Sequence, residues 1–367
     1  MKYMRSIIMM IVIVVTISSF LVTACAPKAT TSESGERETA QYETEEPAST
    51  TEAAETTAEK PKKEKILVGW SFCNLISLFW QAQEDHIKKY SDDKGHEYII
   101  TDAEEDPAKQ DSQVKDLIAR NVDAVVVIPQ DQEAICASID AVRAAGKPII
   151  SMSRSPACLD KVDYDVGSDS YQFASAIVDW LAKQADEKNI TINLLLLVGD
   201  LRDNNAVLRR TGVIENVPKY ADKIKVVTEI PTEWNQDKAL SGTTNALQAN
   251  PEINAIFVPS DYLLPSVIAS LKAANKLLNF DDPNHIILAT IDGDPYGVAQ
   301  IKAGYADVDV AHDPWGWVEM SLDAAVKLVN GETLPSKKDV QVPVVATRDN
   351  VESLGDKLWG NVYKITE

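Results

Sequence analysis

From Ile66 onward, short runs of β-favouring residues alternate with longer segments of helical periodicity. One such segment carries apolar residues at Val114, Leu117 and Ile118, a spacing typical of a helix packed on one face. Regular alternation of strands and helices predicts an α/β fold with right-handed crossovers. The predicted strands are Ile66–Trp70, Glu97–Thr101, Ala124–Ile128, Pro148–Met152, Val162–Val166, Ile192–Val198, Lys225–Glu229, Ala255–Val258, Ile286–Ile291 and Val308–Ala311.

Several of these strands have no polar face. Val125–Ile128 and Leu194–Leu197 are continuously apolar. A strand that is apolar on both sides is typical of a parallel sheet covered by helices on both faces. Ten strands in a chain of 367 residues predict two sheets, and hence two doubly wound parallel-sheet lobes.

Polar residues gather where the predicted strands end. In open α/β sheets the ligand binds beyond the carboxyl ends of the strands, so we expect these residues to form a polar cleft. They are Ser71 and Asn74, Pro129–Asp131, Ser153 and Arg154, Gly199 and Asp200, Ser260 and Asp261, Asp292–Asp294, and His312–Trp315.

Composition and motifs exclude several classes of function. With 36 Lys and Arg against 56 Asp and Glu, the formal charge of −20 repels nucleic acid. The four histidines and four cysteines lack the spacing of a metal site. The sequence contains no GxSxG, Walker A or GxGxxG motif at a strand end. We therefore expect no nucleic-acid partner, no metal or other cofactor, and no enzymatic activity.

Residues 1–24 predict a lipoprotein signal peptide. Lys2 and Arg5 precede an apolar run that is short for a bilayer span. The run ends in Leu-Val-Thr-Ala-Cys25, which resembles the bacterial lipobox, whose cysteine is lipidated and becomes the first residue of the mature chain. The alternative is an ordinary signal peptide followed by a chance cysteine. A lipid on Cys25 would anchor the protein to the membrane without spanning it.

Residues 25–64 are rich in Thr, Ser, Glu, Ala and Lys and contain one aromatic residue, Tyr42. Such a segment buries too little apolar surface to offset its chain entropy, so we expect a disordered acidic tether. Three cysteines follow it: Cys73, Cys136 and Cys158. One disulfide among them is compatible with this number, but we favour three buried apolar thiols.

The residue types at the strand ends suit a ligand rich in hydroxyl groups. Arginine presents a fixed fork of donors, aspartate accepts from two hydroxyls, and aromatic rings pack against the C–H faces of a sugar. The residues that offer this chemistry are Arg154, Arg209, Asp292, Phe79, Trp80 and Trp234.

From about Lys65 to the C-terminus, the chain resembles the type I periplasmic sugar-binding proteins, the ribose, galactose and xylose group that serves ABC importers. Each matching stretch is weak alone, but their order and spacing are specific. The stretches are Ile66–Ser71 with Phe79 and Trp80, Asp106–Gln110, Ile128–Asp131, Lys147–Arg154, Val166–Asp169, Arg209–Gly212, Phe257–Asp261 and Ile291–Gly293.

The resemblance implies two lobes joined by a three-segment hinge, which closes them on a ligand bound between them. It places residues 65–168 and 312–341 in the N-terminal lobe, and residues 169–311 and 342–367 in the C-terminal lobe. It further implies roles for single residues. Phe79 and Trp80 would stack on the sugar from the first lobe, and Trp234 from the second.

The remaining roles concern polar groups. The resemblance implies that Arg154 and Arg209, one from each lobe, donate to ligand oxygens, with Arg210 as an alternative to Arg209. Asp292 would accept from hydroxyls, and His312 stands at a hinge position where the family often has Gln or Asn. Weaker candidates are Ser71, Ser260 and Asp261, of which Asp261 could serve only as a helix cap.

Departures from the family pattern bear on the ligand. Ribose binders usually carry Asn, Asp and Asn where this chain has Ile128, Ser153 and Ser260. The ligand could therefore be a deoxysugar, a larger sugar or a furanose rather than ribose. The acidic loop Asp200–Asn205 lacks the spacing of the calcium loop of galactose-type binders, so we expect no calcium site there.

The resemblance implies an extracytoplasmic, lipid-anchored monomer that binds a monosaccharide or sugar-like ligand and delivers it to an ABC permease. It would face the outside of the cell membrane, at the surface of a monoderm or in a periplasm. One alternative is a sensory module that presents sugar to a membrane histidine kinase or chemoreceptor. A secreted glycosidase using paired carboxylates such as Asp292 and Asp294 is the enzymatic alternative. DNA-binding repressors of this fold are excluded, because an export signal and acidic tether stand where their helix-turn-helix would be.

Overall fold

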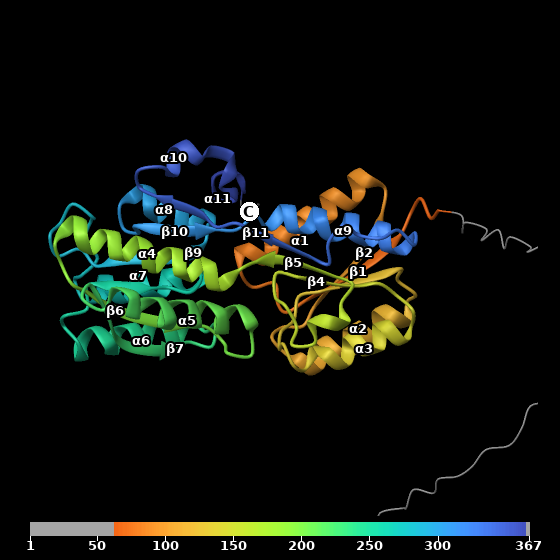
Figure 1. The fold of residues 1–367 in the computed structure, drawn as a ribbon, viewed down its shortest axis with the longest axis horizontal. Coiled ribbons are helices and arrows are strands. Elements are labelled where there is room, and N and C mark those ends of the chain that lie inside the picture. The colour runs from red at the N-terminus through yellow and green to blue at the C-terminus, as the bar shows by residue number, and fades with distance from the viewer. Residues whose placement is uncertain (1–61, 365–367) are drawn as a thin grey trace, which may run out of the picture. The chain divides into compact units, whose positions relative to one another are not determined.

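The computed structural model describes residues 62–364. These residues form two six-stranded sheets, each covered by helices on both faces, and thus two α/β lobes (Figure 1). The predicted fold class is therefore confirmed. The signal peptide, Cys25 and nearly all of the tether lie outside the described residues. Between residues 62 and 364, no helix combines the length and the apolar character needed to cross a membrane.

The first sheet has the strand order β11-β5-β4-β3-β1-β2, and all its pairings are parallel. Strands β1 to β5 coincide with predicted runs. The sixth strand, β11, is an edge strand rich in polar residues and was not predicted. The strands are β1 (Leu67–Phe72), β2 (Glu97–Asp102), β3 (Ala124–Val127), β4 (Ile149–Met152), β5 (Tyr164–Ser168) and β11 (Lys338–Gln341).

The second sheet has the order β12-β10-β9-β8-β6-β7. Its pairings are parallel except at one edge, where β12 runs antiparallel to β10. This antiparallel edge strand was not predicted. The strands are β6 (Ile192–Val198), β7 (Ile224–Pro231), β8 (Ala255–Phe257), β9 (Ile287–Asp292), β10 (Val308–Ala311) and β12 (Val344–Thr347).

Helices cover both faces of the first sheet. Val126 packs in one apolar cluster with α1 and α9, and its neighbours Val125 and Val127 pack in another with α2 and α3. The continuously apolar strand thus serves two cores, because successive side chains point to opposite faces. The helices are α1 (Leu78–Lys94), α2 (Pro107–Ala119), α3 (Ile135–Ala144) and α9 (Pro314–Val329), with a short 3₁₀ turn at Leu159–Lys161.

The second sheet is covered in the same way. Leu194 and Leu196 pack with α4 and α5, and Leu195 and Leu197 with α6, α7 and α8. The helices are α4 (Ser170–Lys188), α5 (Asn204–Asn216), α6 (Gln236–Ala249), α7 (Leu264–Ala273), α8 (Pro295–Ala303), α10 (Val351–Leu354) and α11 (Trp359–Val362), with 3₁₀ turns at Val217–Tyr220, Asp261–Leu263 and Gly355–Lys357.

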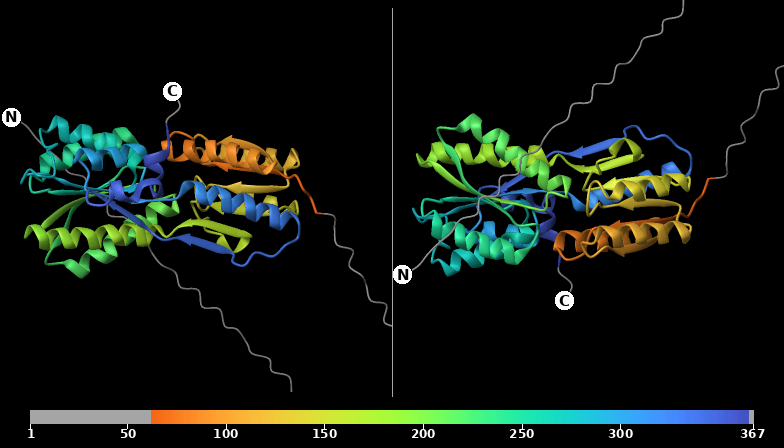
Figure 2. Two further views of the ribbon diagram at one scale, coloured as in Figure 1. Left: turned by 90° about the horizontal axis from the view of Figure 1, so that it is seen from above. Right: turned by 90° about the horizontal axis from the view of Figure 1, so that it is seen from below.

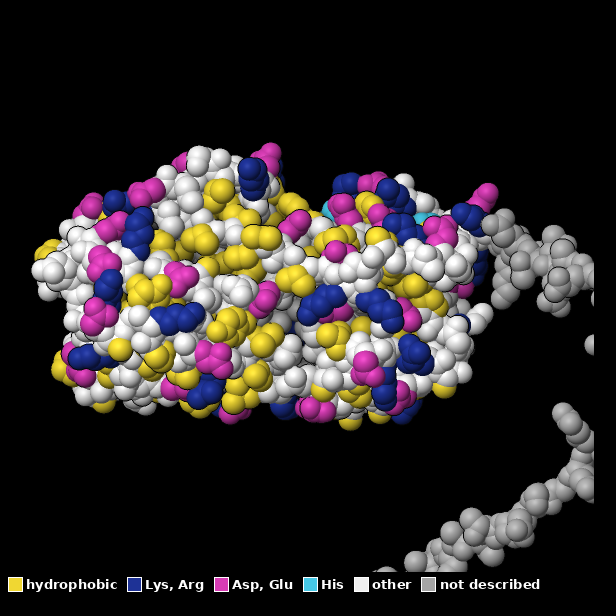
Figure 3. All heavy atoms as spheres, viewed as in Figure 1, with side chains coloured by type: hydrophobic (Ala, Val, Ile, Leu, Met, Phe, Trp, Pro, Cys, Tyr) yellow, Lys and Arg dark blue, Asp and Glu magenta, His cyan; other side chains and the backbone are white. Residues whose placement is uncertain are grey.

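The chain passes between the lobes three times: from β5 to α4, from β10 to α9, and from β11 to β12. Figure 2 shows these segments at the junction of the two lobes. The C-terminal segment adds a further bridge, because the Trp359 ring lies 5.9 Å from that of Phe79 and the Tyr363 hydroxyl donates to Asp85 at 3.1 Å. On the face shown in Figure 3, acidic and basic side chains are interspersed on both lobes.

The cysteines correct one expectation. Cys136 and Cys158 form a disulfide, whereas Cys73 is a free, buried thiol. The favoured interpretation of three buried thiols is therefore wrong for two of them. The bond joins the start of α3 to the loop after β4, two segments that the strand order brings to the same end of the first sheet.

Candidate functional site

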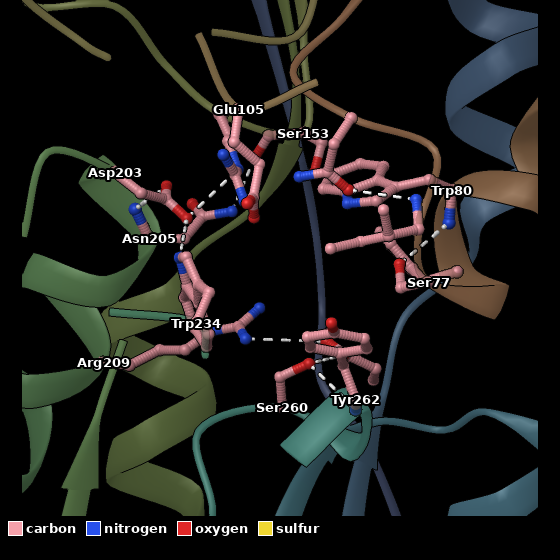
Figure 4. Close-up of a pocket in the computed structure, with 15 residues that line it drawn as sticks. Ser77, Trp80, Glu105, Ser153, Asp203, Asn205, Arg209, Trp234, Ser260 and Tyr262 are labelled. Atoms are coloured by element: carbon pink, nitrogen blue, oxygen red, sulfur yellow. Dashed lines mark hydrogen bonds and ion pairs between the residues drawn. The ribbon is translucent and has the colours of Figure 1, made fainter. Parts of the chain in front are cut away.

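A pocket lies between the lobes, at the carboxyl ends of the strands of both sheets. The space between its side chains, including its opening to solvent, is about 500 Å³. Figure 4 shows side chains from both lobes converging on it. The lining residues are Asn74, Ile76, Ser77, Phe79, Trp80, Glu105, Ser153 and Arg154 from the first lobe, and Asp203, Asn205, Arg209, Trp234, Ser260, Tyr262 and Asp292 from the second.

The first lobe contributes an aromatic wall. Phe79 and Trp80 stand in the first turn of α1, which begins where the Ser77 side chain accepts a hydrogen bond from the Trp80 backbone N–H. The two rings meet edge to face with centroids 5.0 Å apart, and Phe79 also packs against Trp317 of α9. Each ring is 7% exposed, so both belong to the core and still present an edge to the pocket.

Arg154 is the cationic group of the first lobe. It follows β4, and only 6% of its surface is exposed. Its Nε lies 3.1 Å from an Asp203 carboxylate oxygen of the second lobe, and its guanidinium carbon lies 5.3 Å from the centre of the Trp80 ring. Burial is the largest single influence and works against the positive charge, but Asp203, Asp200 and other nearby anionic groups together outweigh it, so the pKa of Arg154 is raised above its ordinary value.

The floor of the second lobe is a network of buried polar groups. Arg209 donates to the Pro259 carbonyl oxygen at 2.5 Å and lies 3.5 Å from an Asp292 carboxylate oxygen. Ser260 donates to the other oxygen of the same carboxylate. Asp292 and Arg209 are 6% and 5% exposed, so this ion pair meets the pocket at its edge and is otherwise held in the protein.

His312 lies behind this floor. Its Nε2 is 3.0 Å from Arg209 Nη2, and its ring stacks on Phe173 with centroids 4.6 Å apart. Burial lowers the pKa of His312, although its contact with Asp292 acts in the opposite direction. A neutral imidazole whose Nε2 accepts from Arg209 satisfies both observations.

Trp234 faces Arg209 and Asp203 in the pocket (Figure 4). Its Nε1 donates to an Asp203 carboxylate oxygen at 3.1 Å. The ring lies against the backbone of Gly199, where an added Cβ would stand 2.2 Å from a ring carbon. Gly199 is thus required for the position of this tryptophan.

Behind Asp292, the second lobe buries three further carboxyl groups. Asp261 accepts from Thr290 Oγ1 at 2.6 Å and from the Asp294 N–H at 2.8 Å, while Asp309 accepts from the Gly293 N–H at 3.0 Å. Burial, together with the neighbouring carboxylates, raises the pKa of Asp309 to about 8 and that of Asp294 to about 7, and holds the pKa of Asp261 well above its usual range.

Seven of the predicted site residues line the pocket: Phe79, Trp80, Arg154, Arg209, Trp234, Ser260 and Asp292. Three do not. Ser71 is fully buried beside the Gln110 amide, Asp261 is fully buried beneath Asp294, and His312 supports Arg209 from behind. Arg210, the alternative to Arg209, pairs with Glu229 away from the pocket.

Sequence reasoning missed Ile76, Ser77, Glu105, Asp203, Asn205 and Tyr262, and it named Asn74 and Ser153 only as strand-end residues. A signal existed for some of them: Asp203 and Asn205 follow β6 within a few residues, and Tyr262 is the residue after Asp261. The sequence of the Asp203 loop suggested only a calcium site, which its spacing excludes. In the structure, Asp200 in this loop binds Arg202, and residues 62–364 contain no group of three or more His, Cys, Asp or Glu arranged to hold a metal ion.

The chain forms two α/β lobes around a polar pocket, and three crossing segments connect them. This arrangement defines a solute-binding protein that holds its ligand between the lobes. Residues 68–333 match the family model described as "Periplasmic binding protein domain". The chain belongs to this family, as the resemblance implied.

Curated relatives agree with this assignment. The chain is 27% identical over 286 residues to the ribose import binding protein of Bacillus subtilis (strain 168). This match covers 77% of this chain and 87% of that protein. It is 28% identical over 284 residues to a putative rhizopine-binding protein of Rhizobium meliloti, with coverage of 76% and 88%.

Solved structures give the same fold. A galactofuranose binding protein superposes with a TM-score of 0.74 at 21% identity, over 81% of this chain and all of that one. An ABC transporter solute binding protein from Bacillus halodurans C-125 with bound myo-inositol gives 0.71 at 28% identity, over 81% and 98%. These relatives and neighbours are solute-binding proteins and not enzymes, so the chain is a binding protein, as expected.

Proposed function

We propose that this protein is the substrate-binding component of an ABC importer and binds a monosaccharide or a sugar-like cyclic polyol between its lobes. The observation that carries the proposal is the pairing of buried Arg209 and Asp292 at the pocket floor. Together they offer donors and acceptors to adjacent hydroxyl groups, while Trp80 and Trp234 offer ring surfaces to C–H groups. The named ligands of the relatives, ribose and myo-inositol, belong to this class of molecule.

Binding works by closure of the lobes. Three contacts join them around the pocket: Arg154 to Asp203, the Asn205 amide donating to the Ser153 carbonyl oxygen at 3.0 Å, and the Gln132 N–H donating to the Arg202 carbonyl oxygen at 2.9 Å. These contacts exist only when the lobes are together. A ligand that touches both lobes adds to them and shifts the population toward the closed form.

The site residues divide into two groups. Phe79, Trp80, Arg154, Arg209, Trp234, Ser260 and Asp292 would touch the ligand, because they line the pocket. Ser71, Asp261 and His312 would act from behind by fixing the groups in front of them. We assign residues 65–168 and 312–341 to one lobe and residues 169–311 and 342–367 to the other, a division supported by the membership of the two sheets.

The proposal includes the N-terminal region. A lipid on Cys25 would hold a monomeric receptor at the outer face of the cell membrane, with residues 25–64 as its tether to the membrane. Mass spectrometry of the membrane-extracted protein tests this: a diacylglycerol-modified Cys25 is expected, and an unmodified mature N-terminus would contradict it.

A thermal-shift panel tests the ligand class. It would contain neutral pentoses, hexoses and cyclitols, with nucleosides and amino acids as controls. A ligand at about 100 times its dissociation constant adds about 2.7 kcal/mol to stability, or several degrees. A shift with one sugar or cyclitol epimer and not its neighbours is expected. A shift only with amino acids or nucleosides would contradict the proposal.

Capture from membranes tests the partner. With the bound sugar present, the proposal expects recovery of an ABC permease. Recovery of a histidine kinase or chemoreceptor instead would replace import with the sensory function that the sequence also allowed.

A further inference from the structure

More carboxylates than guanidinium groups line the pocket. Two guanidinium groups, Arg154 and Arg209, face three carboxylates, Asp203, Asp292 and Glu105. Each arginine has a carboxylate partner from the protein itself: Asp203 for Arg154 and Asp292 for Arg209. No cation among the lining residues is left to compensate a negative charge brought by the ligand.

Asp203 makes the less expected of these pairs. It lies in the second lobe, is 2% exposed, and meets Arg154 of the first lobe across the pocket. One carboxylate oxygen lies near Arg154 Nε and accepts from Trp234 Nε1, and the other accepts from the Asn205 N–H at the start of α5. A single side chain therefore connects the cation of one lobe, the aromatic ring of the other and the beginning of a helix.

The pair changes what Arg154 offers a ligand. Beside Asp203, the guanidinium remains a hydrogen-bond donor, but its charge is already neutralised inside a closed, poorly hydrated site. A ligand carboxylate or phosphate would place a second anion next to Asp203, with Glu105 also lining the pocket. Like charges brought together without water repel strongly, so the closed form would be lost.

We propose that Asp203 is a specificity-determining and positioning residue: it neutralises Arg154 across the cleft and so restricts the pocket to ligands without negative charge. This inference rests on the proposed function, because it concerns which polyhydroxylated ligands the same pocket accepts. It predicts that removing the charge of Asp203, while keeping its N-cap hydrogen bond to the Asn205 N–H, frees Arg154 to pair with an anionic sugar.

The substitution Asp203→Asn removes the charge and keeps the helix cap. The one oxygen of an asparagine can accept from the Asn205 N–H, so asparagine is as good a helix N-cap as aspartate, although its amide nitrogen cannot accept from Trp234 Nε1. The matched control is Asp106→Asn, which makes the same change at the N-cap of α2, where the side chain accepts from the Ala108 N–H at 2.8 Å and does not line the pocket. A second variant, Asp203→Ser, removes the charge with another good N-cap and serves if the first does not fold.

The measurement is calorimetric titration with paired probes: D-galactose with D-galacturonate, D-glucose with D-glucuronate, and myo-inositol with inositol 1-phosphate. The wild type and Asp106→Asn are expected to bind a neutral probe and to reject its anionic partner by at least about 100-fold. In Asp203→Asn, the neutral probe should weaken and the ratio of the two dissociation constants should fall by at least about 10-fold.

The outcomes separate the two proposals. If the wild type binds a neutral probe but Asp203→Asn and Asp203→Ser keep the wild-type ratio, the inference is overturned and the proposed function stands. Preference of the wild type for an anionic probe also overturns the inference alone. If the wild type binds none of the probes, and only nucleosides or amino acids shift its melting temperature, the proposed function fails and the inference fails with it.

Discussion

The two lobes build their halves of the pocket from different groups. The first lobe offers the rings of Phe79 and Trp80, which also belong to its apolar core, and one cation, Arg154. The second lobe offers the paired Arg209 and Asp292, with further buried carboxyl groups behind them. The first half is thus mainly an aromatic wall, and the second, beside the ring of Trp234, is mainly a polar floor whose groups depend on one another.

This difference predicts different responses to mutation. Truncating a side chain of the aromatic wall lowers ligand affinity in proportion to the apolar surface removed. Removing one member of a buried polar network costs more affinity than the lost ligand contact alone, because the partner of that member is left without its hydrogen bond. Variants in the second lobe should therefore cost more ligand affinity than variants in the first.

The largest effect is expected from Asp292→Ala. It removes the hydroxyl acceptor and leaves Arg209 without its carboxylate, so ligand binding should weaken by about 2–4 kcal/mol. Asp292→Asn, which keeps an oxygen at the same place, should lose less. Calorimetry with the sugar identified by thermal shift measures both, and wild-type affinity of the alanine variant would remove Asp292 from the site.

The next effect concerns the stability of the first lobe. Replacing both Cys136 and Cys158 by Ser opens a loop of 22 residues, which is expected to lower stability by about 3 kcal/mol. Thermal unfolding of this variant, compared with Cys73→Ser as control, measures the loss. Equal melting temperatures for the double variant and the oxidised wild type would show that the bond is unimportant for the first lobe.

A smaller loss of affinity is expected in the aromatic wall. Trp80→Ala removes a ring that faces the pocket and the guanidinium of Arg154, and should weaken binding by about 1–2 kcal/mol. Trp80→Phe keeps a ring and should lose less than half of that. A loss larger than that of Asp292→Ala would reverse the comparison between the lobes.

The last effect is a dependence of stability on pH in the second lobe. The raised pKa of Asp309, about 8, means that the folded state holds a proton that the unfolded chain releases above about pH 4. Stability should therefore fall as the pH rises from about 4 to about 8, and level off above that range.

Asp309→Asn tests this dependence, because the amide is neutral at every pH and can still accept from the Gly293 N–H. Between pH 5 and pH 8 the variant should lose less stability than the wild type, while Asp261 and Asp294, whose pKa values are also raised, keep part of the pH dependence in both proteins. Thermal unfolding at several pH values measures this. If the melting temperatures of the two proteins fall equally between pH 5 and pH 8, the assignment of the proton to Asp309 is contradicted.

The buried strands and the edge strands were predictable to different degrees. All ten strands expected from β-favouring runs exist, because a buried parallel strand has a strong local signal. The edge strands β11 and β12 were missed, because Lys338–Gln341 is mostly exposed and polar and Val344–Thr347 has only four residues. Pairing at the edge of a sheet depends on neighbours that are distant in sequence.

Prediction of the site failed where side chains act across the cleft. Arg154 lies two residues after β4 and Asp292 is the last residue of β9, and both were found, whereas the partner of Arg154 was not. Asp203 reads in sequence as one acid in an acidic loop, and its role arises only when the second lobe brings it to 3.1 Å from Arg154. The Cys136–Cys158 disulfide was missed for a similar reason, because the count of cysteines does not specify which of them meet.

The central claim is that a neutral polyhydroxylated ligand is held between an aromatic wall and a paired-charge floor. The most direct measurement is a calorimetric titration of the purified wild-type protein and Asp292→Ala with the neutral sugar or cyclitol that gives the largest thermal shift. The account predicts one site per chain for the wild type and binding weakened by roughly 30-fold or more in the variant. Equal binding by both proteins would place the ligand elsewhere and contradict the account.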